Sequence, residues 1–194
     1  MVGGLLHRVP WTKGATYDQI CEQYSAYVTK KYGKATVVFD GHSDTSSTKD
    51  CAHMRRSSGK ISVTVQFTSS MALQTKKEEF LSNEQNKQRF IILLSQRLEQ
   101  SGCEIHQASR GDADVLIVQT ALKSATEQET VLVGDDTDLL VFLICRAINV
   151  SHTVPFRPET KRSSQKKNRF WYIPAIRALL RSIVTNCSAC HLWM

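Results

Sequence analysis

Three carboxylates stand directly after an apolar run in the stretch VLVGDDTDLL, and this arrangement restricts the fold more than any other feature of the sequence. The apolar run Val131–Val133 ends at Gly134, and a second apolar segment begins only five residues later. Between the two segments stand the acids Asp135, Asp136 and Asp138. Like charges repel at close range, and burying them is costly unless something pairs them. These acids therefore either occupy a solvated turn or hold a cation.

Apolar periodicity along the chain alternates between the spacing of helices and that of strands. Tyr17, Ile20, Tyr24 and Val28 recur at helical spacing, whereas ISVTVQF alternates apolar and polar positions. Strands are predicted at residues 35–39, 61–67, 103–109 and 130–134. Helices are predicted at residues 17–32, 53–56, 78–102, 112–125, 136–147 and 174–184. Strands that alternate with helices favour an α/β fold with a mainly parallel central sheet flanked by helices.

Acidic residues stand at or just past the ends of three predicted strands. Asp40 follows ATVVF, and Asp112 and Asp114 follow CEIHQASRG. Asp135, Asp136 and Asp138 follow TVLVG. The carboxyl ends of parallel strands lie at one edge of a sheet, where the ligands of open α/β folds gather. A single aspartate after a strand commonly caps the next helix. Capping alone explains three acidic clusters at one edge poorly, so a ligand site is the sharper interpretation.

Carboxylate oxygens are the ligands that hard cations such as Mg²⁺ and Mn²⁺ prefer. Two such ions about 3.5–4 Å apart stabilise the attacking and leaving oxygens of a phosphodiester displacement. The Asp-x-Asp spacing places two carboxylates near one helix start, where the positive end of the helix dipole offsets part of their repulsion. We therefore predict an Mg²⁺ or Mn²⁺ site whose ligands come from the aspartates of these three clusters.

The whole positive excess of the chain lies in its last fifth. From Pro155 onward there are eight lysines and arginines and one acid, Glu159, whereas the first 154 residues hold 17 basic and 17 acidic side chains. Concentrated positive charge suits a phosphate backbone, and the alternatives are a solvated basic loop or a nuclear import signal in KRSSQKKNR. The candidate nucleic-acid contacts are Lys161, Arg162, Lys166, Lys167 and Arg169.

Three segments together resemble the acidic signature of the PIN-like, flap-endonuclease and 5′-exonuclease superfamily. They are VVFDG, GDADVLIVQTAL and VLVGDDTDLL. Within that superfamily the chain is similar to uncharacterised animal proteins associated with mobile elements. The segments STKDCAHMRR, KKEEFLSNEQNKQRF and FRPET extend the likeness over most of residues 3–172. The resemblance implies a PIN-like domain over residues 1–173, followed by a divergent C-terminal helix and tail over residues 174–194.

The resemblance also implies an activity and roles for particular residues. It implies a metal-dependent nuclease that hydrolyses phosphodiesters of DNA or RNA with an activated water. It also implies that the metal ligands are Asp40, Asp112, Asp114, Asp136 and Asp138. In flap-type nucleases a helix after the FDG acid carries a lysine and an arginine that grip the scissile phosphate. Lys49 and Arg56 are the candidates for these catalytic roles, and Arg55 is an alternative contact to the nucleic acid.

Two departures from the family pattern keep other functions open. Val2 stands where the family has its first-strand aspartate, and no acid follows Glu159, although the family has a further acid past its last helix. A catalytically inactive PIN-like relic, or a module that binds nucleic acid or protein, is therefore an alternative. A phosphatase of the haloacid-dehalogenase type, with Asp136 as nucleophile and Asp138 as acid, is a third reading that leaves FDG and GDAD without a role.

Apolar runs and cysteines bear on compartment and partners. No apolar run approaches the roughly 20 residues of a membrane span, and the one at the start is too short for a secretory signal. We expect an intracellular protein, nuclear or cytoplasmic and not secreted, that is a monomer with no membrane partner and no small-molecule cofactor. CSACH at residues 187–191 matches a c-type haem attachment pattern, but without an export signal we attribute it to chance.

Overall fold

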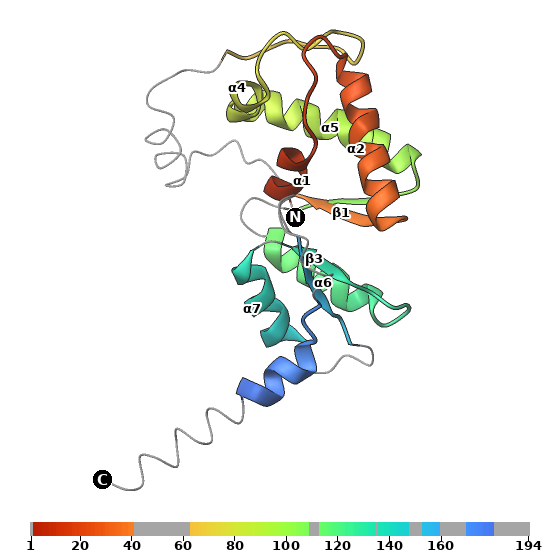
Figure 1. Cartoon of the computed structure of the whole chain (residues 1–194), viewed down its shortest axis with the longest axis vertical. Helices are drawn as coiled ribbons and strands as arrows, with labels where there is room; N and C mark the ends of the chain where they lie inside the picture. The colour runs from red at the N-terminus through yellow and green to blue at the C-terminus, as the bar shows by residue number, and fades with distance from the viewer. Residues whose placement is uncertain are drawn as a thin grey trace, which may run out of the picture. The chain divides into compact units, whose positions relative to one another are not determined.

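The computed structural model describes six stretches of the chain: residues 2–40, 63–108, 113–134, 136–147, 153–159 and 170–180. They belong to two compact units, an N-terminal unit of Val2–Ala113 and a C-terminal unit that begins at Asp114 (Figure 1). The predicted short helix at residues 53–56 lies outside the described residues.

The N-terminal unit is mainly helical and contains one pair of short strands. Its elements are α1 (Val2–Arg8), α2 (Tyr17–Tyr32), β1 (Thr36–Phe39), α4 (Lys77–Ser82), α5 (Glu84–Gln100) and β2 (Glu104–Gln107). Strands β1 and β2 are parallel, with Thr36 opposite Glu104 and Phe39 opposite Gln107. The turn between α5 and β2 contains Gly102, whose φ of +84° lies in the left-handed region that glycine adopts without strain.

The first predicted helix is confirmed as α2, and its start is fixed by a capping box. The hydroxyl of Thr16 accepts a hydrogen bond from the backbone N–H of Gln19 at 3.2 Å, and the side chain of Gln19 accepts one from the N–H of Thr16 at 3.0 Å. These reciprocal bonds satisfy backbone amides that have no partner inside the helix. The helix then buries Ile20, Tyr24 and Val28 on one face.

Aromatic rings from α2, α4 and α5 meet in the core of the N-terminal unit. The ring centroid of Trp11 lies 4.8 Å from that of Phe90 and 5.5 Å from that of Phe80. Trp11 Nε1 donates to the hydroxyl of Tyr24 at 2.9 Å, and that hydroxyl donates to the backbone oxygen of Leu6. The polar atoms of Trp11 and Tyr24 are therefore paired, so Tyr24 is fully buried and Trp11 partly buried without an unsatisfied donor.

The single helix predicted over residues 78–102 is wrong, because the chain is broken at Asn83 into α4 and α5. Asn83 has an extended backbone, with φ −84° and ψ 119°, and its side chain accepts a hydrogen bond from the N–H of Asn86 at 3.0 Å. Asparagine is among the best helix N-caps, because its side-chain oxygen satisfies an amide of the first turn. The apolar periodicity runs across this break and does not reveal it.

The strand predicted at residues 61–67 is not formed in its described part, residues 63–67. The buried side chain of Asn86 takes the place of a neighbouring strand: its Oδ1 accepts from the N–H of Val65 at 2.8 Å, and its Nδ2 donates to the oxygen of Val63 at 3.0 Å. Because one side-chain amide satisfies these backbone groups, the segment needs no strand partner there.

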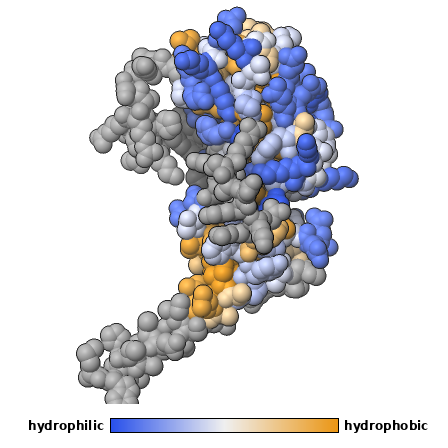
Figure 2. Space-filling view, viewed as in Figure 1, coloured by the Kyte–Doolittle hydropathy of each residue, from blue (hydrophilic) through white to orange (hydrophobic). Residues whose placement is uncertain are grey.

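The C-terminal unit alternates helices with short strands. Its elements are α6 (Ala113–Ser124), β3 (Leu132–Gly134), α7 (Thr137–Arg146) and β4 (Phe156–Pro158), followed by helical residues 173–180. Strands β3 and β4 are parallel, with Leu132 opposite Phe156. Leu132, Phe156, Leu139 and Leu143 are buried between the strands and α7. Hydrophobic surface remains exposed over α7 and helical residues 173–180 (Figure 2).

The predicted mixed α/β class with parallel strands is confirmed for the described residues. Their strands form two two-stranded sheets, β1–β2 and β3–β4, where the sequence predicted one central sheet. In each sheet one strand is followed closely by a predicted site residue. Asp40 directly follows β1, and Asp136 lies two positions after the end of β3. Among the described helices, none has both the length and the apolar character needed to cross a membrane.

Candidate functional site

Asp40 is the first residue after β1, as the sequence predicts. The strand end that carries it is held firmly, because Phe39 is fully buried and its backbone oxygen accepts from the N–H of Ala108 at 2.8 Å. The side chain of Asp40 is half-buried, and its Oδ1 is shielded from solvent without a hydrogen-bond partner among the described residues. Buried polar atoms are nearly always paired, so this carboxylate oxygen requires an explanation.

Asp136 has a different environment at the end of β3. It is exposed and forms the N-cap of α7, where its Oδ1 accepts from the backbone N–H of Asp138 at 3.0 Å. Asp138 is also exposed and lies in the first helical turn, where the positive end of the helix dipole favours a carboxylate. The helix-capping role weighed from the sequence is therefore present at Asp136.

Gly134 sets how closely the acidic turn approaches the core of the C-terminal unit. A Cβ atom at this position would lie 2.7 Å from Cδ2 of Leu139 and 3.0 Å from Cε2 of Phe156. Both neighbours are buried, so neither moves away at low cost. A side chain at position 134 would therefore force Leu139 or Phe156 to shift, so the close packing of β3 against α7 favours glycine there.

Glu159 is an acid at the same strand ends that the sequence reasoning did not include in the site. It directly follows β4, is only 9% exposed, and donates its backbone N–H to the oxygen of Gly134 at 2.9 Å. Its backbone therefore lies beside the residue that precedes the acids of β3. The sequence does place Glu159 shortly after the apolar segment VPF, as an acid past a strand would be. The reasoning from sequence assigned this region to the basic segment and so did not consider Glu159.

The remaining predicted site residues divide into those that the structure describes and those outside it. Asp114 is half-buried in the first turn of α6. The other predicted residues, together with Asp135, lie outside the described residues: Lys49, Arg55, Arg56, Asp112, Lys161, Arg162, Lys166, Lys167 and Arg169.

The described acids belong to both units. Asp40 lies in the N-terminal unit, and Asp114, Asp136, Asp138 and Glu159 lie in the C-terminal unit. Within the part of the chain that the structure describes, no three His, Cys, Asp or Glu side chains are close enough together to hold a metal ion. The donor chemistry nonetheless suits a hard divalent cation, because every candidate ligand is a carboxylate and one oxygen of Asp40 is buried without a described partner.

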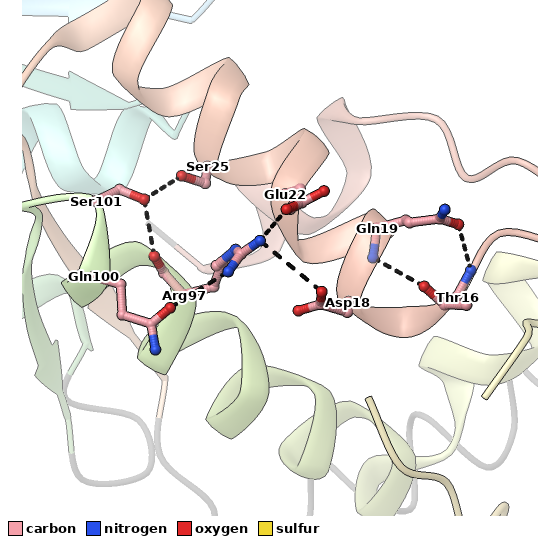
Figure 3. Close-up of polar contacts among 8 residues, drawn as sticks. All are labelled: Thr16, Asp18, Gln19, Glu22, Ser25, Arg97, Gln100 and Ser101. Carbon is pink, nitrogen blue, oxygen red and sulfur yellow. Dashed lines mark hydrogen bonds and ion pairs between the residues drawn. The ribbon is translucent and has the colours of Figure 1, made fainter. Parts of the chain in front are cut away.

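A second group of charged side chains joins α2 to α5 (Figure 3). Arg97 pairs with Glu22 and approaches Asp18 at 3.9 Å, while the hydroxyl of Ser101 lies 2.5 Å from that of Ser25. The acids of this group are half exposed to solvent and satisfied by Arg97, so the group clamps two helices and offers no open position for a ligand.

Two titratable side chains with shifted pKa values, Cys21 and Lys77, owe the shift chiefly to burial in the N-terminal unit. Burial raises the pKa of the Cys21 thiol to about 12, so this thiol stays protonated and unreactive near neutral pH. Burial lowers the pKa of Lys77, whose Nζ donates to the backbone oxygen of Val9 at 2.7 Å and lies 5.9 Å from the ring centroid of Trp11. Neither group is a candidate nucleophile or base.

No family model matches the chain, and no curated protein or solved structure is significantly similar to it.

Proposed function

We propose that this chain is a metal-dependent phosphodiesterase that acts on DNA or RNA and resembles the structure-specific 5′ nucleases. The observation that carries the proposal is the Oδ1 of Asp40, which is buried at the carboxyl end of a parallel strand and has no hydrogen-bond partner among the described residues. A buried acceptor left unpaired destabilises a protein by about 1–3 kcal/mol, and by more when it is charged. A bound cation removes this cost, and the edge of a parallel sheet is where α/β proteins bind ligands.

Carboxylates of the predicted set would hold the ion. Asp40 offers its buried oxygen, and Asp136 has a second carboxylate oxygen besides the one that caps α7. Asp112, Asp114 and Asp138 are the other predicted ligands, and carboxylate oxygens are the ligands that Mg²⁺ and Mn²⁺ prefer. When bound, such an ion stabilises negative charge on phosphoryl oxygens and lowers the pKa of a coordinated water.

The basic side chains of the chain position the substrate in this proposal. Lys49 and Arg56 grip the scissile phosphate, and Arg55 is the alternative contact. The basic run from Lys161 to Arg169 neutralises phosphates farther along the strand, so binding weakens as salt is added. The proposal includes the finer fold prediction, a PIN-like domain with one mainly parallel central sheet.

A binding module without catalysis is the second candidate, and one observation favours it. Asp136 and Asp138 are exposed, and the Oδ1 of Asp136 already accepts from the first turn of α7. Helix capping therefore gives the carboxylate of Asp136 a partner without a metal ion. In this alternative the chain binds nucleic acid through its basic residues and cleaves nothing.

The test is cleavage of labelled single-stranded and 5′-flap DNA by the purified chain in Mn²⁺, with EDTA as the metal-free control. The variant to compare is the double substitution Asp136→Asn, Asp138→Asn, because asparagine keeps the cap but loses the charge. Glu129→Gln, which removes one exposed charge elsewhere in the C-terminal unit, is the matched control.

The proposal predicts cleavage that requires Mn²⁺, is lost in the double variant and is retained in Glu129→Gln. A chain that is folded by circular dichroism and binds DNA but cleaves neither substrate would establish the binding module instead. Cleavage that survives in the double variant would show that these acids do not hold the catalytic ion.

A further inference from the structure

Three consecutive aromatic side chains of the C-terminal unit are exposed. Phe170 is 38% exposed, Trp171 is 46% exposed and Tyr172 is 58% exposed. Large aromatic side chains are usually buried well beyond this, because each one removes a large apolar area from water. A row of three exposed rings is therefore a feature that the stability of the unit does not explain.

The backbone of these residues is held in place. Trp171 forms an antiparallel bridge with Phe156 of β4: its N–H donates to the oxygen of Phe156 at 2.8 Å, and its oxygen accepts from the N–H of Phe156 at 3.0 Å. Ile173, the next residue after the row, is 1% exposed and anchors the chain on its other side. The backbone that carries the exposed rings is thus fixed against β4.

Charge indicates what these rings contact. The segment from Pro155 onward carries the whole net positive charge of the chain, and Lys166, Lys167 and Arg169 precede Phe170 by at most four residues in the sequence. Exposed aromatic rings within a positively charged segment are the combination with which proteins bind single strands, because bases stack on the rings and cations neutralise the phosphates. Bases inside a duplex are already stacked on one another and cannot reach a protein ring without being unpaired.

We propose that Phe170, Trp171 and Tyr172 form a stacking surface for unpaired bases of a single-stranded nucleic acid. This inference rests on the proposed function and specifies its substrate, which must contain a single-stranded segment. A second copy of this chain is the rival occupant, since Val141, Phe142, Leu179 and Leu180 are also exposed in the C-terminal unit. These side chains are mostly aliphatic and offer no plane for a base, so they do not extend the stacking surface.

The test is the affinity of the full chain for two fluorescently labelled oligonucleotides, measured by anisotropy in EDTA so that metal-dependent cleavage cannot occur. One is an oligothymidylate and the other an abasic strand of the same length and charge. Tyr172→Ala removes the most exposed ring, and Tyr172→Phe keeps the ring while removing the hydroxyl. Leu179→Ala, at a side chain that is 61% exposed in the same unit, is the matched control.

The proposal predicts that Tyr172→Ala weakens binding of the oligothymidylate on the order of 10-fold and leaves binding of the abasic strand unchanged. Tyr172→Phe and Leu179→Ala should bind as the unaltered chain does. Equal affinity for the two strands, or no effect of Tyr172→Ala, would overturn the stacking surface. So would a Tyr172→Ala variant that changes only self-association in sedimentation.

The two proposals fail in different experiments. Base-dependent binding in EDTA together with no cleavage in Mn²⁺ leaves the stacking surface standing and removes the catalytic proposal. Cleavage in Mn²⁺ together with base-independent binding does the reverse.

Discussion

Asp40 and Asp136 have the same side chain near the ends of parallel strands, yet their environments differ. One oxygen of Asp40 is buried and accepts no hydrogen bond from any described residue. Asp136 is exposed and its Oδ1 satisfies an amide of α7. Substitution by asparagine separates capping from ligation, because asparagine caps helices about as well as aspartate but binds hard cations far more weakly.

The first prediction concerns the cap. Asp136→Ala should lower the free energy of unfolding by about 1 kcal/mol, because the amide of Asp138 loses its acceptor. Asp136→Asn should change it by only a few tenths of a kcal/mol. Urea titration followed by circular dichroism measures both values. Equal losses in the two variants would show that the carboxylate charge, and not the cap, stabilises α7.

The second prediction concerns the pH dependence of stability. The pKa of the Cys21 thiol is raised from 9.0 to about 12, chiefly by burial. The folded chain therefore holds the thiol proton of Cys21 more tightly than the unfolded chain does. The contribution of this proton to the free energy of unfolding is complete below pH 9 and is lost as the pH rises toward 12. Each pH unit in this window removes up to about 1.4 kcal/mol.

Cys21→Ala should make this alkaline decline shallower, whereas Cys145→Ala, which removes an exposed thiol, should leave it unchanged. Urea unfolding at pH 7, 9 and 10 provides the comparison. An unaltered decline in Cys21→Ala would mean that other groups cause it.

At the scale of elements, packing outweighs charge between α2 and α5. Phe90 is fully buried against Trp11 and Tyr24, whereas Arg97 is partly exposed and pairs with half-exposed acids. Exposed ion pairs contribute about 0–1 kcal/mol, while removing a buried phenylalanine ring costs about 3–5 kcal/mol. The aromatic core, and not the clamp of Figure 3, therefore holds these helices together.

The third prediction follows from this comparison. Phe90→Ala should destabilise the N-terminal unit by about 3–5 kcal/mol, and Arg97→Ala by less than about 1 kcal/mol. The smaller effect should shrink further in 1 M salt, where the screening length is about 3 Å. Urea titrations at low and high salt measure both. An Arg97→Ala loss as large as that of Phe90→Ala would contradict the assignment.

The fourth prediction concerns the contact between β3 and α7. Gly134→Ala should destabilise the C-terminal unit by about 1–3 kcal/mol, because the new Cβ would overlap the side chain of Leu139. Leu139→Ala makes room for that methyl group. The double variant should therefore be less destabilised than the sum of the two single losses, which a double-mutant cycle measures. If the losses of the two single variants simply add in the double variant, the overlap with Leu139 is not the cause of the destabilisation.

Local patterns predicted the elements whose partners are near in the sequence. Helix α2 and strand β1 were predicted because their apolar spacing coincides with the buried face. The break at Asn83 was not predicted, because it depends on the side chain of Asn83 accepting from the backbone N–H of Asn86. The missing strand at residues 63–67 was not predicted, because the side chain of Asn86 takes the place of a strand partner. Such a side-chain contact across more than 20 positions leaves the hydrophobic pattern unchanged.

At the scale of the whole molecule, the sequence predicted which acids stand at strand ends but not which acids join them. Asp40 and Asp136 were identified because each follows an apolar segment closely. Glu159 was missed, because its place beside Gly134 depends on the pairing of β3 with β4 across more than 20 residues. The division of the described strands into two parallel pairs was missed for the same reason, because strand pairing depends on residues far apart in the sequence.

The central claim is that the predicted aspartates hold a divalent cation, and binding of Mn²⁺ tests it most directly. Titration of the chain with Mn²⁺, with the free ion followed by electron paramagnetic resonance, gives the affinity without any substrate. We expect binding by the unaltered chain and by Glu129→Gln. Asp40→Asn and Asp136→Asn should each weaken Mn²⁺ binding by at least about 10-fold, because loss of even a residue that hydrogen-bonds a metal ligand weakens metal binding by about 10–100-fold. Mn²⁺ that stays free, or is bound equally well by Asp40→Asn, would contradict the claim.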